Sequence, residues 1–239
     1  MSPTTLNLVA AGVFLTTLMI LGGPALNLSP LVPSALTVAI LALATGDRFL
    51  WDGQGGTLLV DWFANRSAAH RERVLHHEAG HFLVAELLGV PVTAYSLCAW
   101  EAFQQGQTAR GGVQFDETQV QAQLSQGQLS VQLFSHYSTI WMAGIAAETL
   151  CFGRADGGGD DRQLLLNAVA QLRRANPQGV PPFAVQQNIA LQRARTLLEQ
   201  QAPAYRALVE AMRAGQSPDQ CRAAIAQATA AVEPEPLQR

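Results

Sequence analysis

The chain has 239 residues, a formal net charge of −3 and only 14% charged residues, against roughly 25% in a typical soluble domain. The negative charge and the lack of a basic stripe exclude the usual nucleic-acid-binding classes. Three widely spaced cysteines without a Cys-x-x-Cys pair exclude a disulfide scaffold and a cysteine zinc site, and they favour a reducing compartment.

The charge deficit lies in the first 46 residues, which contain no Asp, Glu, Arg or His. Turn formers and helix breakers (GGPALNLSP) separate two apolar runs, 6–21 and 31–45, and each run approaches the about 20 residues of a membrane-spanning helix. We therefore predict a transmembrane hairpin over 1–46. Two buried core helices or a partly inserted interfacial hairpin are the alternatives. Because arginines follow the hairpin, the positive-inside rule places 47–239 on the cytoplasmic side of an integral membrane protein.

Beyond the apolar runs, hydrophobic residues recur at helical spacing in most segments. A helix is predicted at 68–88, and the Gly-Val-Pro sequence after it is a stop signal. Two short alternating segments, 92–98 and 111–115, are expected to pair as strands. The further helices are predicted at 119–126, 129–152, 160–174, 184–200, 204–214 and 219–230.

These elements divide the chain into four parts. The hairpin at 1–46 is followed by a linker at 47–67, a compact domain at 68–230 and a flexible tail at 231–239. The predicted fold class is mostly α: a two-helix transmembrane hairpin, followed by a helical domain with one small β-sheet.

A short motif in the first helix of the compact domain carries metal chemistry. Residues 76–81 read HHEAGH, and four of the five histidines lie within twelve residues. His77 and His81 are four residues apart, so their rings share a helix face and reach one Zn²⁺ at about 2.0–2.1 Å. Glu78 is then placed to hold a water molecule, to take its proton and to deliver the proton to a leaving amine. This is the HExxH arrangement of zinc peptidases, and surface histidines on a core helix are the alternative.

Two histidines do not complete a catalytic zinc site, which has a third protein ligand and an open position for water. No third histidine follows at HExxHxxGxxH spacing, and the residues alone do not rank Glu148, Asp160, Asp161 and His136. The acidic pair is equally suited to cap a helix N-terminus. Glu148 is suited either to orient a ligand histidine or to form a salt bridge, and His136 to lie in the core.

Three segments, the first of which contains the HHEAGH motif, resemble one protein family. The segment HRERVLHHEAGHFLVAELLGVPV resembles the zinc-binding helix of the FtsH-type membrane metalloproteases, whose hallmark is HEAGH. MAGIAAETLCFG is similar to the family segment GGRAAEE-[LIV]-x-FG, and GGGDDRQLLLNA lies where the family has Gly-x-x-Asn-Asp-Leu. The resemblance covers about residues 68–215 and implies a helical zinc-peptidase domain. It implies Asp161 as the third Zn²⁺ ligand, with Asp160 as the alternative after a one-residue slip.

The chain departs from this family in one respect. It has no GxxxxGK[ST] motif, and too few residues precede the zinc helix for the ATPase module of the family. It therefore resembles the ATPase-lacking branch, which implies a plasma or thylakoid-type membrane and no use of ATP. Family ring assembly depends partly on the missing module, so a homo-oligomer and an association with ATP-dependent relatives both stay open.

The function predicted from these observations is that of a membrane-anchored zinc metalloendopeptidase without its own ATPase. Its expected substrates are proteins or peptides that are membrane-associated or unfolded, and the two strands offer an edge for an extended peptide. The alternative is a non-proteolytic peptidase-like scaffold that assembles with membrane protein complexes. An intramembrane protease is disfavoured, because charged residues flank the motif and each costs about 2.5–3.5 kcal/mol at the bilayer centre.

Overall fold

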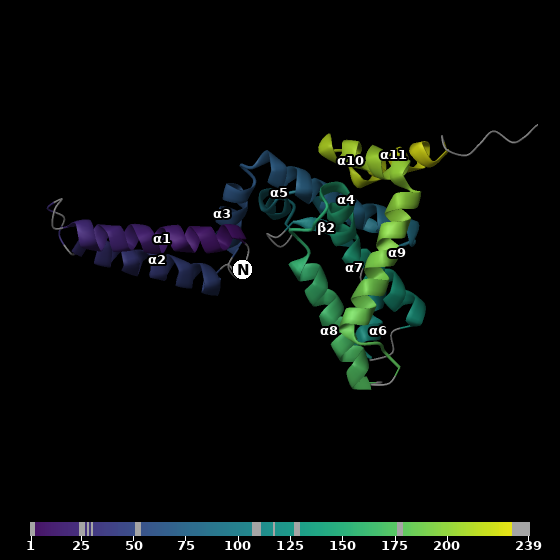
Figure 1. Cartoon of the computed structure of the whole chain (residues 1–239), viewed down its shortest axis with the longest axis horizontal. Helices are drawn as coiled ribbons and strands as arrows, with labels where there is room; N and C mark the ends of the chain where they lie inside the picture. The colour runs from purple at the N-terminus through teal and green to yellow at the C-terminus, as the bar shows by residue number, and fades with distance from the viewer. Residues whose placement is uncertain are drawn as a thin grey trace, which may run out of the picture. The chain divides into compact units, whose positions relative to one another are not determined.

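The computed structural model describes residues 3–23, 27, 29, 31–50, 54–106, 111–116, 118–126, 130–175 and 179–230. The flexible tail predicted at 231–239 lies outside the described residues. The chain forms two compact units (Figure 1). Unit 1 consists of Met1–His70 and Cys98–Gly111, and unit 2 of Arg71–Leu97 and Gly112–Arg239.

Unit 1 contains four of the helices. They are α1 (Pro3–Gly22), α2 (Leu31–Leu50), α3 (Gln54–Ala64) and α5 (Ala99–Gln104), and α1 and α2 lie side by side (Figure 1). Helix α3 occupies much of the segment predicted as a linker. The Asp47 carboxylate accepts hydrogen bonds from the amides of Gly55 and Gly56 at 2.8 and 2.9 Å, which satisfies free N–H groups at the start of α3.

The prediction that the first 46 residues form a transmembrane hairpin is wrong. Among the described residues, no helix is both long enough and apolar enough to cross a membrane. The integral-membrane localisation and its cytoplasmic orientation, which rested on that hairpin, are therefore wrong as well. Within these helices the hydroxyls of Thr16 and Thr17 donate to α1 carbonyls, and α2 carries the charged pair Asp47–Arg48 near its end.

Unit 2 is mostly helical with one small sheet, as predicted for this part of the chain. Helix α4 begins just before it and supplies its first residues. The elements are α4 (Ala68–Leu87), β1 (Val92–Ser96), β2 (Gly112–Phe115), α6 (Thr118–Ser125), α7 (Val131–Phe152), α8 (Gly159–Ala175), α9 (Phe183–Gln200), α10 (Ala202–Arg213) and α11 (Pro218–Ala230).

Helix α7 is the centre of the core of unit 2. It is apolar on nearly all sides, so it has to be covered on all sides. Its residues from Tyr137 to Glu148 are all buried, and α8 and α9 pack against it. The Ser130 hydroxyl accepts from the Leu133 amide to cap its start, and Gly153 ends it in the left-handed region with φ of 76°.

Two glycines allow α4 and α7 to cross at close range. A Cβ atom on Gly80 would lie 2.7 Å from the Ala143 carbonyl oxygen and 2.7 Å from the Ala147 Cβ. A Cβ atom on Gly144 would lie 2.5 Å from His77 Nε2, inside the space that the ring occupies. The small residues of both helices therefore bring α7 directly under the histidines of α4.

The sheet lies on the side of α4 that carries Glu78. Strands β1 and β2 are antiparallel, with Tyr95 opposite Val113 and Ser96 opposite Gly112, and an irregularity between Val92 and Ala94 shifts the register. Together α4, α7, the start of α8 and β2 surround the side chains of the HHEAGH motif.

Candidate metal centre

A hydrogen bond at Nδ1 holds each of the two motif histidines in one orientation. His77 Nδ1 lies 2.7 Å from Glu148 Oε1, and His81 Nδ1 lies 2.7 Å from the Ile140 carbonyl oxygen. Because a carbonyl and an ionised carboxylate can only accept, each Nδ1 carries a proton and donates it. In the neutral rings, the free lone pair is therefore on Nε2, which is the atom that would bind a metal.

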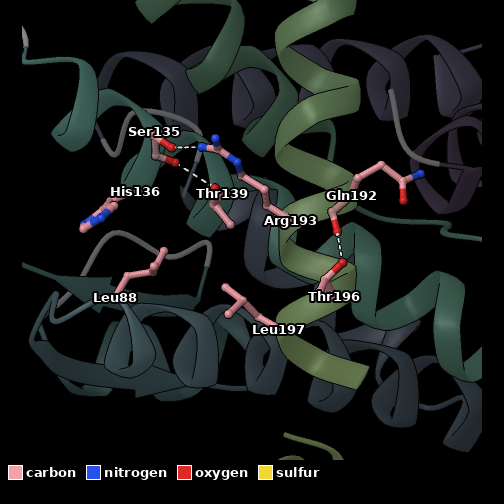
Figure 2. Close-up of a pocket in the computed structure, with 8 residues that line it drawn as sticks. All are labelled: Leu88, Ser135, His136, Thr139, Gln192, Arg193, Thr196 and Leu197. Atoms are coloured by element: carbon pink, nitrogen blue, oxygen red, sulfur yellow. Dashed lines mark hydrogen bonds between the residues drawn. The ribbon is translucent and has the colours of Figure 1, made fainter. Parts of the chain in front are cut away.

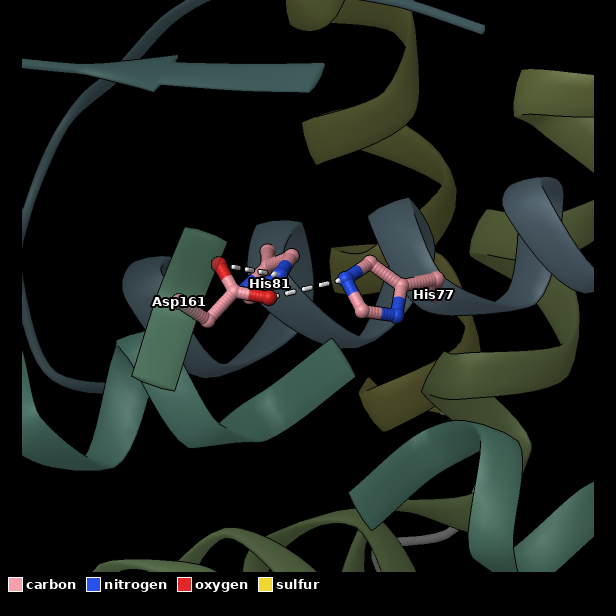
Figure 3. Close-up of side chains that lie close together, drawn as sticks. All are labelled: His77, His81 and Asp161. Carbon is pink, nitrogen blue, oxygen red and sulfur yellow. Dashed lines mark hydrogen bonds and ion pairs between the residues drawn. The ribbon is translucent and has the colours of Figure 1, made fainter. Parts of the chain in front are cut away.

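Asp161 faces both of these Nε2 atoms (Figure 3). Its Oδ2 lies 3.1 Å from His77 Nε2, and its Oδ1 lies 3.5 Å from His81 Nε2. One ligand atom of each residue falls within 4.8 Å of the others. The structure thus brings together the three residues that the sequence and the family resemblance assign to zinc.

The turn before α8 places Asp161 at this point. Gly158 has φ of 81°, and a Cβ atom there would lie 2.2 Å from Ile145 Cγ1, so the turn needs glycine for both conformation and space. The neighbouring Asp160 is exposed in the same first turn of α8 and lies outside the cluster among the described residues. His136, the other distant candidate, lines a pocket between α7 and α9 instead.

Glu148 is the carboxylate that orients His77. It is 2% exposed and accepts from the amides of Asp156 at 2.8 Å and Gly157 at 3.2 Å, besides an ion pair with Arg73 at 3.4 Å. Burial raises the pKa of Glu148, but the hydrogen bonds from His77 and from these amides outweigh burial and hold its pKa below the ordinary value. The carboxylate is therefore ionised and its four partners fix it in place.

The electrostatics of the cluster suit a cation. Burial lowers the pKa of His77, but its hydrogen bonds to Asp161 and Glu148 outweigh burial and raise the pKa to about 10. Burial also lowers the pKa of His81, and Asp161 more than reverses it. The pKa of Asp161 itself is held well below its ordinary range, against burial, by the two histidines. The carboxylates thus favour positive charge at this point, which either protonated imidazoles or a divalent ion with neutral imidazoles would supply.

Glu78 stands beside the cluster, next to the sheet. Its Oε2 accepts a hydrogen bond from the Val113 amide at 2.9 Å, and a Cβ atom on Gly112 would lie 3.5 Å from the same oxygen. The N–H of one residue in β2 is therefore directed at the carboxylate that follows the first ligand histidine. This is the place that a general base for a metal-activated water requires.

His76 belongs to a different group of side chains. Its Nδ1 lies 2.8 Å from the Tyr205 hydroxyl and 3.3 Å from Cys151 Sγ, and its Nε2 lies 3.4 Å from Glu72. The rings of His76 and His77 thus have different partners on different faces of α4, because consecutive side chains of a helix point about 100° apart.

Sequence reasoning did not identify Arg73, which ties the outer part of the site together. Its guanidinium contacts Glu148, the Arg154 carbonyl at 3.1 Å and the Asp156 carboxylate at 3.2 Å. The available signal was its position four residues before His77, which puts it on the same helix face.

No family model, no curated protein and no solved structure matches this chain. The likeness to the FtsH-type metalloproteases therefore rests on the sequence segments alone, and the proposals below are argued from the geometry of the site.

Proposed function

We propose that the chain is a zinc-dependent endopeptidase that hydrolyses peptide bonds with a metal-activated water and without an ATPase of its own. The observation that carries the proposal is the convergence of His77 Nε2, His81 Nε2 and the Asp161 carboxylate, with each Nδ1 already engaged by an acceptor. Two imidazoles and one carboxylate that leave a position for water are the donor set of a catalytic zinc.

The roles of the protein residues follow from their positions. His77, His81 and Asp161 hold the ion, and Glu148 keeps the His77 ring turned toward it. When bound, Zn²⁺ supplies Lewis acidity that lowers the pKa of water and polarises the scissile carbonyl. Glu78 accepts the proton of the attacking water and gives it to the leaving amine, while the Val113 amide holds the carboxylate in position.

The substrate that suits this site is a peptide in extended conformation. The edge of β2 lies next to Glu78, because the Val113 amide reaches its carboxylate. A peptide that adds to this edge through main-chain hydrogen bonds would present its carbonyl beside the proposed base. The proposed substrates are therefore unfolded or loosely folded segments, which can be extended in this way.

A second candidate is a peptidase-like domain without proteolytic activity. It is favoured by one observation: Asp161 pairs with both histidines and Glu78 accepts from the Val113 amide, so these side chains satisfy one another. In that reading the same residues serve as a buried ion-pair network that stabilises the junction of α4, α7 and α8.

The two candidates are separated by metal analysis together with three variants. Zinc content is measured on the purified protein by elemental analysis, and cleavage of an unfolded fluorogenic protein is followed with and without a chelator. Glu78→Gln should keep zinc and lose activity, and Asp161→Asn should lose both. Asp160→Asn removes the neighbouring charge in the same turn and should change neither. A metal-free wild type that Glu78→Gln matches in every assay would leave only the scaffold candidate.

A further inference from the structure

A pocket unrelated to the metal centre lies between α7 and α9. It has a volume of about 460 Å³ and is lined by Ser135, His136 and Thr139 of α7 and by Gln192, Arg193 and Thr196 of α9, with the Arg193 side chain reaching Ser135 (Figure 2). A second pocket of about 280 Å³, toward the end of α8, shares Ser135, Thr139 and Arg193 with the first. Together they reach the size of natural small-molecule sites, about 300–1,000 Å³.

Of the described residues that line both pockets, Arg193 is the one with a cationic side chain. Its guanidinium donates to the Ser135 hydroxyl (Figure 2), and no ion pair of the described residues includes it. Of the residues described as lining the two pockets, none is Asp or Glu and no other is Lys or Arg. A guanidinium on a wall without a carboxylate favours a ligand that carries one.

Ser138 is a second polar residue whose surroundings favour a bound ligand. Its side chain lines the smaller pocket and is 2% exposed, and within the described part of the chain its hydroxyl has no hydrogen-bond partner. An unmade hydrogen bond at such a buried position is unfavourable. A ligand oxygen in the pocket would supply the missing partner.

The rest of the smaller pocket is apolar and partly open to solvent. Val131 is 86% exposed and Ile189 is 42% exposed at its rim. The apolar side chains that line it are those of Val131, Phe134, Leu172, Val180, Ile189 and Ala190. An aliphatic chain lying against these residues would remove apolar surface from water, which is favourable by about 25 cal/mol per Å².

From these features we propose that this pair of pockets binds a monocarboxylate with an aliphatic chain. The carboxylate pairs with Arg193 and accepts from the hydroxyls of α7, and the chain lies on the apolar wall. A phosphate group fits less well, because Arg193 is the single Arg or Lys of the described lining and a phosphate carries up to two charges. The proposal does not depend on the presence of zinc or on peptidase activity.

The test measures binding of decanoate to the full chain by calorimetry, below the concentration at which decanoate forms micelles. Decanoate should bind saturably, and decanol, which has the same chain without the charge, should bind at least about tenfold more weakly. Arg193→Gln should weaken decanoate binding at least about tenfold. Arg195→Gln is the matched control, because Arg195 lies on the same helix, pairs with Glu199 and does not line either pocket.

Ser138→Ala is a second variant, in which a loss of binding cannot be attributed to misfolding. Because its hydroxyl lacks a partner in the free protein, Ser138→Ala should leave thermal stability equal or higher and still weaken decanoate binding severalfold. Absence of saturable binding, equal affinity for decanol and decanoate, or equal effects of the Arg193 and Arg195 variants would each overturn the proposal.

Discussion

Glu148 accepts the Nδ1 proton of His77 across 2.7 Å, so that a carboxylate on α7 sets the orientation of a ring on α4. The relationship matters because a metal-binding imidazole is effective only when its free nitrogen points at the ion. Glu148 is in turn fixed by two backbone amides and by Arg73. We therefore expect Glu148, which does not itself face the proposed metal position, to influence how tightly a metal is held.

We expect Glu148→Gln to lower zinc affinity by about 10- to 100-fold, because a neutral amide is a weaker partner for the Nδ1 proton of His77. Zinc dissociation constants are measured by competition with a chromogenic chelator. Glu199→Gln is the control, since Glu199 forms only an exposed pair with Arg195 at 2.8 Å on α9. Equal zinc affinity of the Glu148 variant and wild type would show that the ring is held by other contacts.

The close crossing of α4 and α7 should be sensitive to one methyl group. Gly80→Ala places a Cβ atom 2.7 Å from both the Ala143 carbonyl oxygen and the Ala147 Cβ, so the helices must separate. We expect a loss of about 1–3 kcal/mol in unfolding free energy, measured by urea denaturation. At Gly159, where nothing lies within 4 Å of the added atom, the same change should not destabilise. Similar losses at both positions would contradict the tight crossing.

The stability of the metal-free protein should fall as the solution becomes alkaline. The folded pKa of His77, about 10, lies above its ordinary value, so its contribution is complete below about pH 6.5 and is lost as pH rises toward 10. The lowered pKa of Asp161 acts in the opposite sense: its contribution is present above about pH 4 and is lost on acidification. Melting temperatures in chelator should therefore decline from near pH 6.5 upward.

Zinc should reverse this trend over part of the range. The ion binds only deprotonated imidazoles, so zinc-loaded protein should gain stability between about pH 5 and pH 8, where the chelated protein does not. Asp161→Asn removes the partner of both histidines and should flatten both profiles. Parallel profiles with and without zinc would exclude binding at these histidines.

Tyr205→Phe should distinguish the role of His76 from that of His77. The Tyr205 hydroxyl lies 2.8 Å from His76 Nδ1 and donates to the His76 carbonyl at 3.0 Å. Its loss should lower the unfolding free energy by about 1 kcal/mol and leave zinc affinity unchanged. A tenfold drop in zinc affinity in this variant would show that His76 and His77 act together.

The sequence was sufficient for the elements of unit 2 and for the two histidines of the site. The four-residue spacing of His77 and His81 predicts a shared helix face, and the apolar run at 129–152 predicts the buried helix α7; both follow from helical period alone. Asp161 could not be chosen over Glu148 or Asp160 by spacing, because its approach depends on how α8 packs onto α7. Only the family resemblance singled it out.

The failures have local causes. The lack of charge in the first 46 residues predicts a transmembrane hairpin, whereas the described helices there do not reach the length and apolarity of a membrane span. Helix α3 was missed because its start is capped from outside, by the Asp47 carboxylate on the previous helix. Helix α5 was missed because its first turn is capped by the Cys98 sulfur, which accepts from the Glu101 amide and is not a usual capping group.

The ring of His77 fills the space in which a side chain at position 144 would lie, only 2.5 Å from the Cβ that glycine lacks. The two helices can therefore pack at this distance only with the imidazole in this position. The packing of the α4–α7 core and the orientation of the first proposed zinc ligand thus depend on the same contact. Under the proposed function, a chain in which this contact has not formed would hold no aligned zinc site and would not cut its neighbours.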